Sequence, residues 1–271
     1  MSLSPQEKFL KKFHSELPGC TSQTMAQATD KEGHSSYQLL ANIIPKTGAF
    51  KVLDVACGDG FLLAQLARRE QLGLELFGID MRKEELLAAE KRVGSAANLQ
   101  LGRIQMLPYP DSSIDFVLCH MAFMLFDNIE EVIAEIERVL KPGGSFSAIV
   151  SAAGVQTPSQ TIFRELHSKT LNKNEFEFLW KIGDPRTRSE EGMRSLFGHA
   201  QRFSAQKFDM RMHKDLDSAV LNYMSYYGPA LLSQNERAQL ESELRKSLEG
   251  LQDSRGLIAC GHNIMKIEIQ K

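Results

Sequence analysis

Cysteine is scarce in this 271-residue sequence. Its four cysteines, Cys20, Cys57, Cys119 and Cys260, form no Cys-x-x-Cys pair. This favours free thiols in a reducing cytoplasm over a disulfide framework. The seven histidines show no metal-ligand spacing, and there is no Gly-x-Ser-x-Gly motif. We therefore expect neither a metal centre nor a serine-hydrolase site.

Long apolar runs and an excess of one charge are also missing. No run approaches the roughly 18 residues of a membrane span, and the N-terminal residues lack the apolar core of a signal peptide. A formal net charge of -2 gives no electrostatic reason to expect nucleic acid or an anionic membrane as a partner. The 42% of hydrophobic residues is enough for a sizeable core. We expect a globular, cytoplasmic protein.

One turn organises the sequence. A buried strand over 52–55 is predicted to run into a turn with Gly58 and Gly60, and a helix follows. The glycines let a ligand approach the backbone, and the amides at the helix N-terminus suit a polar ligand. Asp54 would repel a pyrophosphate there and attract an ammonium group. Leu63 occupies the third glycine position of a dinucleotide fingerprint, which disfavours a nicotinamide-dependent oxidoreductase.

Asp80 closes the next predicted strand, which begins at Leu74. It follows Gly58 by 22 residues, near the spacing of about 20 at which an acid binds a ribose diol. Asp80 could instead cap the following helix, and the two roles are compatible. Strands and helices alternate up to residue 151, which predicts a parallel sheet with right-handed crossovers.

Four segments resemble, in order, the motifs of the class I S-adenosylmethionine-dependent methyltransferases. They are 54–60, 78–81, 107–115 and 138–144. The resemblance lies nearest to the small-molecule, ubiquinone/menaquinone-methyltransferase-like branch. It implies a doubly wound α/β fold with a mostly parallel seven-stranded sheet of order 3-2-1-4-5-7-6 and helical cap insertions. Strands six and seven would form an antiparallel edge.

The resemblance also implies one methyltransferase domain over 1–271. Its parts would be an N-terminal helical lid at 1–46, a cofactor-binding core at 47–152, helical cap segments at 153–200 and 215–252, and C-terminal strands at 203–212 and 257–269.

Three local predictions concern less regular parts of the chain. Residues 20–33 are polar and should be irregular, between a helix over 1–17 and one over 35–44. The third strand should cover 98–104. A helix starting near Leu216 should end at Gly228-Pro229.

The resemblance assigns S-adenosylmethionine as the cofactor. Asp54 would help to hold its ammonium group, and Asp80 would take both ribose hydroxyls. Met81 and Ile104 would pack against the adenine. The predicted cofactor-binding residues are Asp54, Ala56, Cys57, Gly58, Gly60, Asp80, Met81, Arg103, Ile104, Gln105 and Cys119.

Arg103 is the clearest departure from the resembled family. In that family the third strand usually ends in an acid, which accepts a hydrogen bond from the adenine amino group. A guanidinium has no acceptor, so Arg103 cannot take this role. It could stack on the adenine, or Gln105 could offer its carbonyl oxygen.

His120 ends the predicted fourth strand, where ligands of open α/β sheets bind. It is the candidate catalytic residue, as a general base or a group that positions the acceptor, although a structural role is the alternative. His34 and Tyr37 are candidates for the lid, since N-terminal helices often cover the cofactor in the resembled family. Tyr37 could equally be a packing residue.

Aromatic residues in the cap segments could line an apolar acceptor pocket or form a small satellite core. The candidates are Phe176, Trp180, Tyr223 and Tyr227. The implied reaction is in-line methyl transfer to a small-molecule acceptor. The alternatives are a non-catalytic module that binds S-adenosylmethionine or S-adenosylhomocysteine and, less favoured, an NAD-dependent oxidoreductase.

Overall fold

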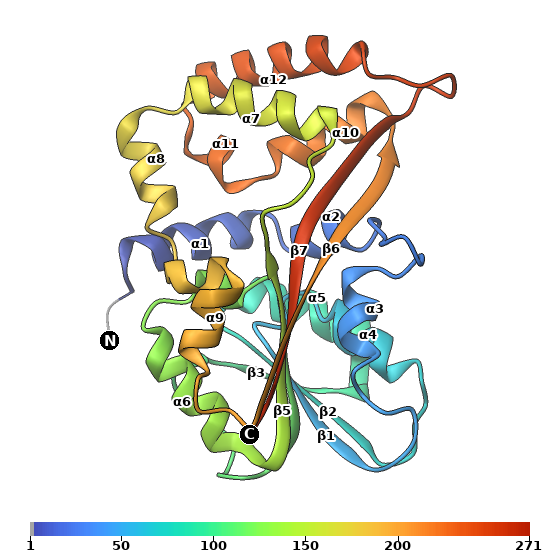
Figure 1. Ribbon diagram of the computed structural model, residues 1–271, viewed down its shortest axis with the longest axis vertical. Coiled ribbons are helices and arrows are strands. Elements are labelled where there is room, and N and C mark those ends of the chain that lie inside the picture. Colours follow the sequence, from blue (N-terminus) through green and yellow to red (C-terminus); the bar gives the residue numbers. More distant parts are fainter. Residues whose placement is uncertain (1–2) are drawn as a thin grey trace.

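The computed structural model describes residues 3–271, and in this range seven strands form one mixed sheet (Figure 1). The strands are β1 (Phe50–Val55), β2 (Leu74–Asp80), β3 (Asn98–Leu101), β4 (Ile114–His120), β5 (Leu140–Ser151), β6 (Arg202–Lys214) and β7 (Ile258–Gln270). Their order is β3-β2-β1-β4-β5-β7-β6, as predicted. β1 to β5 pair in parallel, whereas β7 lies antiparallel between β5 and β6.

Helices cover both faces of this sheet because successive strand residues point to opposite faces. Val52 belongs to a buried cluster that includes Leu63 of α4, whereas its neighbour Leu53 belongs to a second cluster that includes Ile136 of α6. The sheet is therefore doubly wound, and its two faces carry separate cores. The helices around it are α3 (Ser36–Ala41), α4 (Phe61–Ala67), α5 (Lys83–Val93), α6 (Ile129–Val139) and α9 (Glu190–Leu196).

The N-terminal segment is more regular than the sequence predicts. The helices here are α1 (Pro5–Glu16) and α2 (Cys20–Met25). α2 falls within the stretch 20–33 that was predicted to be irregular. Thr29 exchanges backbone hydrogen bonds of 2.9 and 2.7 Å with Arg211 of β6. The polar groups of this stretch are thus satisfied by distant parts of the chain, which a local pattern does not reveal.

The cap helices gather beyond the carboxyl ends of the parallel strands, beside the far ends of β6 and β7 (Figure 1). Phe163, Tyr223 and Leu244 bury their side chains with Ile258 of β7. No helix within residues 3–271 combines the length and apolar character needed to cross a membrane. The cap helices are α7 (Pro158–Thr170), α8 (Lys173–Trp180), α10 (Leu216–Met224), α11 (Tyr227–Leu231) and α12 (Gln234–Glu249).

Three predicted boundaries are wrong. The helix predicted over 35–44 ends at Ala41. β3 ends at Leu101 and not at residue 104, because the chain turns after Gly102, and the Met106 amide bonds back to the Arg103 carbonyl at 3.1 Å. The helix that starts at Leu216 ends at Met224, and the predicted stop, Gly228-Pro229, lies inside α11. Short 3-10 turns complete the structure at η1 (Gly94–Ala96), η2 (Phe123–Leu125) and η3 (Pro185–Arg188).

Candidate functional site

A cavity lies at the carboxyl ends of β1, β2 and β4, where the strand order reverses. This is the edge at which open α/β sheets bind ligands. Helix α1 and the segment that contains α2 contribute to the cavity wall together with these strand ends. The predicted cofactor-binding residues in the wall are Asp54, Ala56, Cys57, Gly58, Asp80, Met81, Arg103, Ile104 and Gln105.

The two glycines of the turn after β1 have different surroundings. Gly58 has a φ of 53°, and a Cβ there would come no closer than 3.7 Å to the Glu85 carboxylate. Gly60 has a φ of 73°, and its Cβ would lie 3.0 Å from the Ala89 Cβ. Gly58 therefore keeps the cavity side of the turn free of a side chain. Gly60 lets α4 pack closely against α5.

Asp80 is buried at the end of β2, with 2% of its surface exposed. Its Oδ2 accepts hydrogen bonds of 3.0 Å from the Gly58 amide and from Nη2 of Arg82. Its Oδ1 accepts bonds of 3.0 Å from the amide and from Nε of Arg82. The carboxylate thus links the first turn to the start of α5.

Asp54 is buried to the same extent at the end of β1. Its Oδ1 has no hydrogen-bond partner within residues 3–271. Burial raises the pKa of this carboxyl well above its ordinary value, and the nearby Asp80 and Asp59 raise it further. A buried acceptor without a donor is costly, so the cavity at Asp54 suits a ligand that brings a positive charge or a donor.

His120 is held at the end of β4 by helix α3. Its Nε2 lies 2.9 Å from the Ser36 hydroxyl, and burial lowers its pKa to about 3. The imidazole is therefore neutral near pH 7. Its Nδ1 has no hydrogen-bond partner in the described part of the chain. A neutral ring with one free nitrogen can orient a polar ligand, but it is a weak base.

The N-terminal end of helix α1 is bonded to the core at the side of the cavity near the end of β3. Glu7 forms an ion pair with Arg103, and the Ser4 hydroxyl donates to Asp127. Gln105 donates to the Asp127 carbonyl at 3.2 Å. Arg103 therefore joins α1 to the core, and the carboxylates of Glu7 and Asp127 line the same end of the cavity.

The other end of α1 is fastened through His14. Its Nε2 lies 2.9 Å from the Tyr227 hydroxyl, and its Nδ1 lies 3.6 Å from the Glu85 carboxylate. Burial lowers the pKa of His14, which Glu85 partly offsets. After α1, the Gly19 amide donates to Glu85 at 3.0 Å, and the Ser22 hydroxyl donates to Asp59 at 2.6 Å. The segment over the cavity is thus bonded to the core along its length.

Comparison with known proteins identifies this core. A family model described as a methyltransferase domain matches residues 53–148. The biotin biosynthesis bifunctional protein BioHC of Cellvibrio japonicus is 32% identical over 120 residues, which are 44% of this chain and 23% of that protein. A demethylmenaquinone methyltransferase of Symbiobacterium thermophilum is 36% identical over 100 residues, which are 35% of this chain and 40% of the relative. The core of this chain is therefore similar to class I methyltransferases. The chain spans less than half the length of either relative.

Solved structures share the fold of this chain. The YcgJ protein of Bacillus subtilis superposes with a TM-score of 0.57 at 17% identity, over 87% of this chain and 97% of that one. Phosphoethanolamine N-methyltransferase 2 of Haemonchus contortus, solved with S-adenosylhomocysteine, gives a TM-score of 0.57 at 16% identity, over 100% of this chain and 61% of that one. At these identities the likeness concerns the fold alone.

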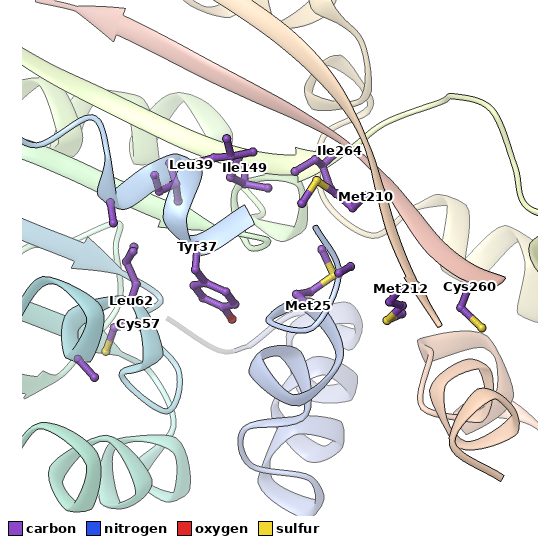
Figure 2. Packing of buried hydrophobic residues seen from close by; sticks show 14 of the residues in the cluster. Met25, Tyr37, Leu39, Cys57, Leu62, Ile149, Met210, Met212, Cys260 and Ile264 are labelled. Carbon is purple, nitrogen blue, oxygen red and sulfur yellow. The ribbon is translucent and has the colours of Figure 1, made fainter. Parts of the chain in front are cut away.

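The structure brings His120 and Tyr37 together with most of the predicted cofactor residues in the cavity wall. Figure 2 shows the Tyr37 ring between Cys57 and Met25, and the side chain is buried in the cavity wall. The two other predicted cofactor residues, Gly60 and Cys119, do not line the cavity. Cys119 belongs to the core cluster on one face of the sheet, and Gly60 faces Ala89.

The remaining lid and acceptor candidates lie away from the cavity wall. His34 lies 3.7 Å from Asp30 and is partly exposed. Phe176 and Trp180 stack on each other at the surface of α8, where the Arg188 guanidinium lies 4.6 Å from the centroid of the Trp180 ring. Tyr223 is fully buried and bonds to Ser159, so it packs the cap core. Tyr227 is not among the residues that line the cavity, but its hydroxyl lies 2.9 Å from Nε2 of His14, which does line it.

Sequence reasoning missed the residues that the N-terminal helices and α5 contribute. Glu7 has the third position of a capping box with Ser4, which is a sufficient local reason for a glutamate there. His14 lies in a helix with the pattern of an ordinary surface helix, and Glu85 lies in the first turn of α5, where acids are favourable. Each has a good local explanation, so no local signal pointed to the cavity.

Proposed function

We propose that this protein transfers a methyl group from S-adenosylmethionine to a small-molecule acceptor. The observation that carries the proposal is the pairing of two buried carboxylates, Asp54 and Asp80, on either side of the Gly58 turn in one cavity. The unpartnered Oδ1 of Asp54 fits an ammonium group, and it would repel the pyrophosphate of a dinucleotide. The family of the core supports the same reaction.

The cavity offers a place for each part of the cofactor. Asp54 would hold the ammonium group, and Gly58 would let the amino-acid part lie against the backbone. Asp80 would accept hydrogen bonds from the ribose hydroxyls. Met81 and Ile104 supply apolar surface for the adenine. Ala56, Cys57, Arg103 and Gln105 complete the wall of this proposed binding site.

Bound S-adenosylmethionine would supply an electrophilic sulfonium methyl group. The protein's main contribution is then to align the acceptor with this methyl group. His120 is the proposed residue for this task, since its ring is fixed by Ser36 and Tyr37 and its Nδ1 is available. Its low pKa makes it a positioning group more than a general base.

We further propose that the acceptor is a small molecule and not a nucleic acid. α1 lines the cavity and is bonded to the core at Glu7 and at His14, which narrows the space there for a large acceptor. The chain would act as a single domain, with 1–46 as its lid and 153–200 and 215–252 as its cap. Because all four cysteines, which lie in the described range, are free thiols, a reducing compartment such as the cytoplasm is the proposed location.

Calorimetric titration with S-adenosylmethionine, S-adenosylhomocysteine and NAD tests the proposal. We expect both adenosyl ligands to bind and NAD not to bind. Binding of NAD alone would replace the proposal with an oxidoreductase. If the adenosyl ligands bind, turnover with a panel of small acceptors, such as phenols, amines and quinols, separates an enzyme from a non-catalytic binding module. A failure of every acceptor, with tight cofactor binding, would favour the binding module.

A further inference from the structure

Arg82 occupies hydrogen-bond acceptor positions of the Asp80 carboxylate, which is proposed to bind the ribose. Asp80 accepts three bonds from Arg82 and one from the Gly58 amide, all of 3.0 Å. A carboxylate offers about four acceptor positions, so those of Asp80 are occupied. Two ribose hydroxyls can therefore bond to Asp80 only after the Arg82 guanidinium has moved away.

Helix capping does not account for an arginine at position 82. It has the N-cap position of α5, with φ of -115° and ψ of 122°, where serine, threonine, aspartate or asparagine would stabilise the helix. Within the described residues the Arg82 side chain caps no amide of α5. It turns back into the cavity wall instead, where 12% of it is exposed. A long cation there, where a short capping residue suits the helix, indicates a role toward the cavity.

Glu85 offers the guanidinium a second partner. It follows Arg82 by three residues on α5, and residues at this spacing share one face of a helix. Its side chain is buried and lines the same cavity. Removing a buried cation from its partner is costly unless another carboxylate is near. A move from Asp80 to Glu85 keeps the charge of Arg82 compensated.

We propose that Arg82 is a built-in competitor for the diol of the ligand. In the free protein it holds Asp80, and a ligand with two adjacent hydroxyls displaces it toward Glu85. This inference rests on the proposed function, because it concerns the same ribose site. Arg82 lowers the apparent affinity for every nucleoside ligand, since only the protein with a displaced guanidinium is competent to bind.

The test is a titration of S-adenosylhomocysteine into the wild-type protein, Arg82→Ser and Lys83→Ser. Serine fits the N-cap conformation, so the first variant should fold at least as well as the wild type. We expect Arg82→Ser to bind about tenfold more tightly or better, because the competing population is removed. Lys83→Ser removes the same charge from the next residue and should bind like the wild type.

Asp80→Asn completes a double-mutant cycle. An amide cannot form the ion pair, so Arg82→Ser should bring no gain in the Asp80→Asn background. If the wild type binds and Arg82→Ser binds no more tightly, or if the gain persists in the Asp80→Asn background, the inference is overturned and the proposed function stands. If neither the wild type nor Arg82→Ser binds an adenosyl ligand, both are overturned. Binding by Arg82→Ser alone supports both.

Discussion

The imidazole of His120 lies flat against the phenol ring of Tyr37. The ring centroids are 3.7 Å apart, and the planes differ by 15°. Ser36, the residue before Tyr37, holds the Nε2 of the same imidazole. Two adjacent residues of α3 thus fix a histidine at the end of β4, and this arrangement keeps the ring buried and neutral.

We predict that His120 makes the fold sensitive to acid. Its pKa of about 3 in the folded protein lies below the ordinary 6.5, so the unfolded chain takes up the proton first as the pH falls. The stabilisation is complete above pH 6.5 and is lost toward pH 3, by about 1.4 kcal/mol per unit. When the pH is lowered from 7 to 5, the free energy of unfolding measured with urea should fall by about 2 kcal/mol more in the wild type than in His120→Gln. Equal losses would contradict this.

Asp80→Ala should weaken the binding of S-adenosylhomocysteine by about 1.5–3 kcal/mol, as for hydrogen bonds to a charged group. The loss should lie toward the lower value, because Asp80 must first give up Arg82. Calorimetry measures the dissociation constant, and circular dichroism checks the fold. An unchanged dissociation constant in a folded variant would remove Asp80 from the ribose site.

Asp54→Asn should have opposite effects on ligand binding and on the free protein. The buried carboxyl has a raised pKa, so it stabilises the fold only at low pH, and its ionisation costs stability as the pH rises. The variant should therefore resist urea better at pH 7. It should bind S-adenosylhomocysteine about 1.5–3 kcal/mol more weakly, and an analogue without the amino group should not distinguish it from the wild type. Equal loss for both ligands would argue against an ammonium contact.

Glu7→Gln should loosen α1. The variant loses the ion pair with Arg103, and we expect amide hydrogen exchange in α1 to be about tenfold faster, as for one lost charge-assisted bond. Glu16→Gln is the matched control, because Glu16 lies at the exposed end of the same helix and pairs only loosely with Lys12, at 3.9 Å. Similar exchange in both variants would show that the Glu7–Arg103 pair does not hold the helix.

Gly60→Ala should destabilise the protein by about 1–3 kcal/mol. The added Cβ would lie 3.0 Å from the Ala89 Cβ and 3.2 Å from its Cα, at a φ of 73°. Gly33→Ala is the control, since its φ is 86° and, apart from Gly33 and its two neighbours in sequence, no atom of the described chain lies within 4 Å of the added Cβ. It should show the conformational cost alone. Urea unfolding compares the two, and equal effects would mean that the contact with Ala89 relaxes freely.

The sheet and the turn at Gly58 could be predicted because their signals are local. Val52 and Leu53 open a short segment, 52–57, in which every residue except Asp54 is apolar, and Asp80 follows Gly58 by 22 residues. The roles of Glu7 and Arg103 could not be predicted in this way. They are 96 residues apart. The capping box explains Glu7 locally, and no local pattern explains Arg103, so only the docking of α1 on the core relates them.

In the cap, the sequence shows the aromatic residues but not what each of them contacts. Composition left open whether the aromatic residues of the cap line an acceptor pocket or form a satellite core. Tyr223 fills the cap core, whereas Trp180 lies at the surface of α8. An aromatic side chain serves packing, surface stacking or ligand contact equally well. The choice between these depends on which face of each helix meets another element, and the sequence of α8 or α10 alone does not contain that information.

Because α1 is bonded to the core at both ends, it can affect the rates at which a ligand binds and leaves. Glu7 holds one end at Arg103, and His14 holds the other at Tyr227 and Glu85. We predict that a molecule bound beneath the helix exchanges with bulk solvent mainly when one of these contacts opens. Association and dissociation would then slow together, with little change in their ratio. Release of the product S-adenosylhomocysteine, and not the chemical step, would then limit the rate of repeated turnover.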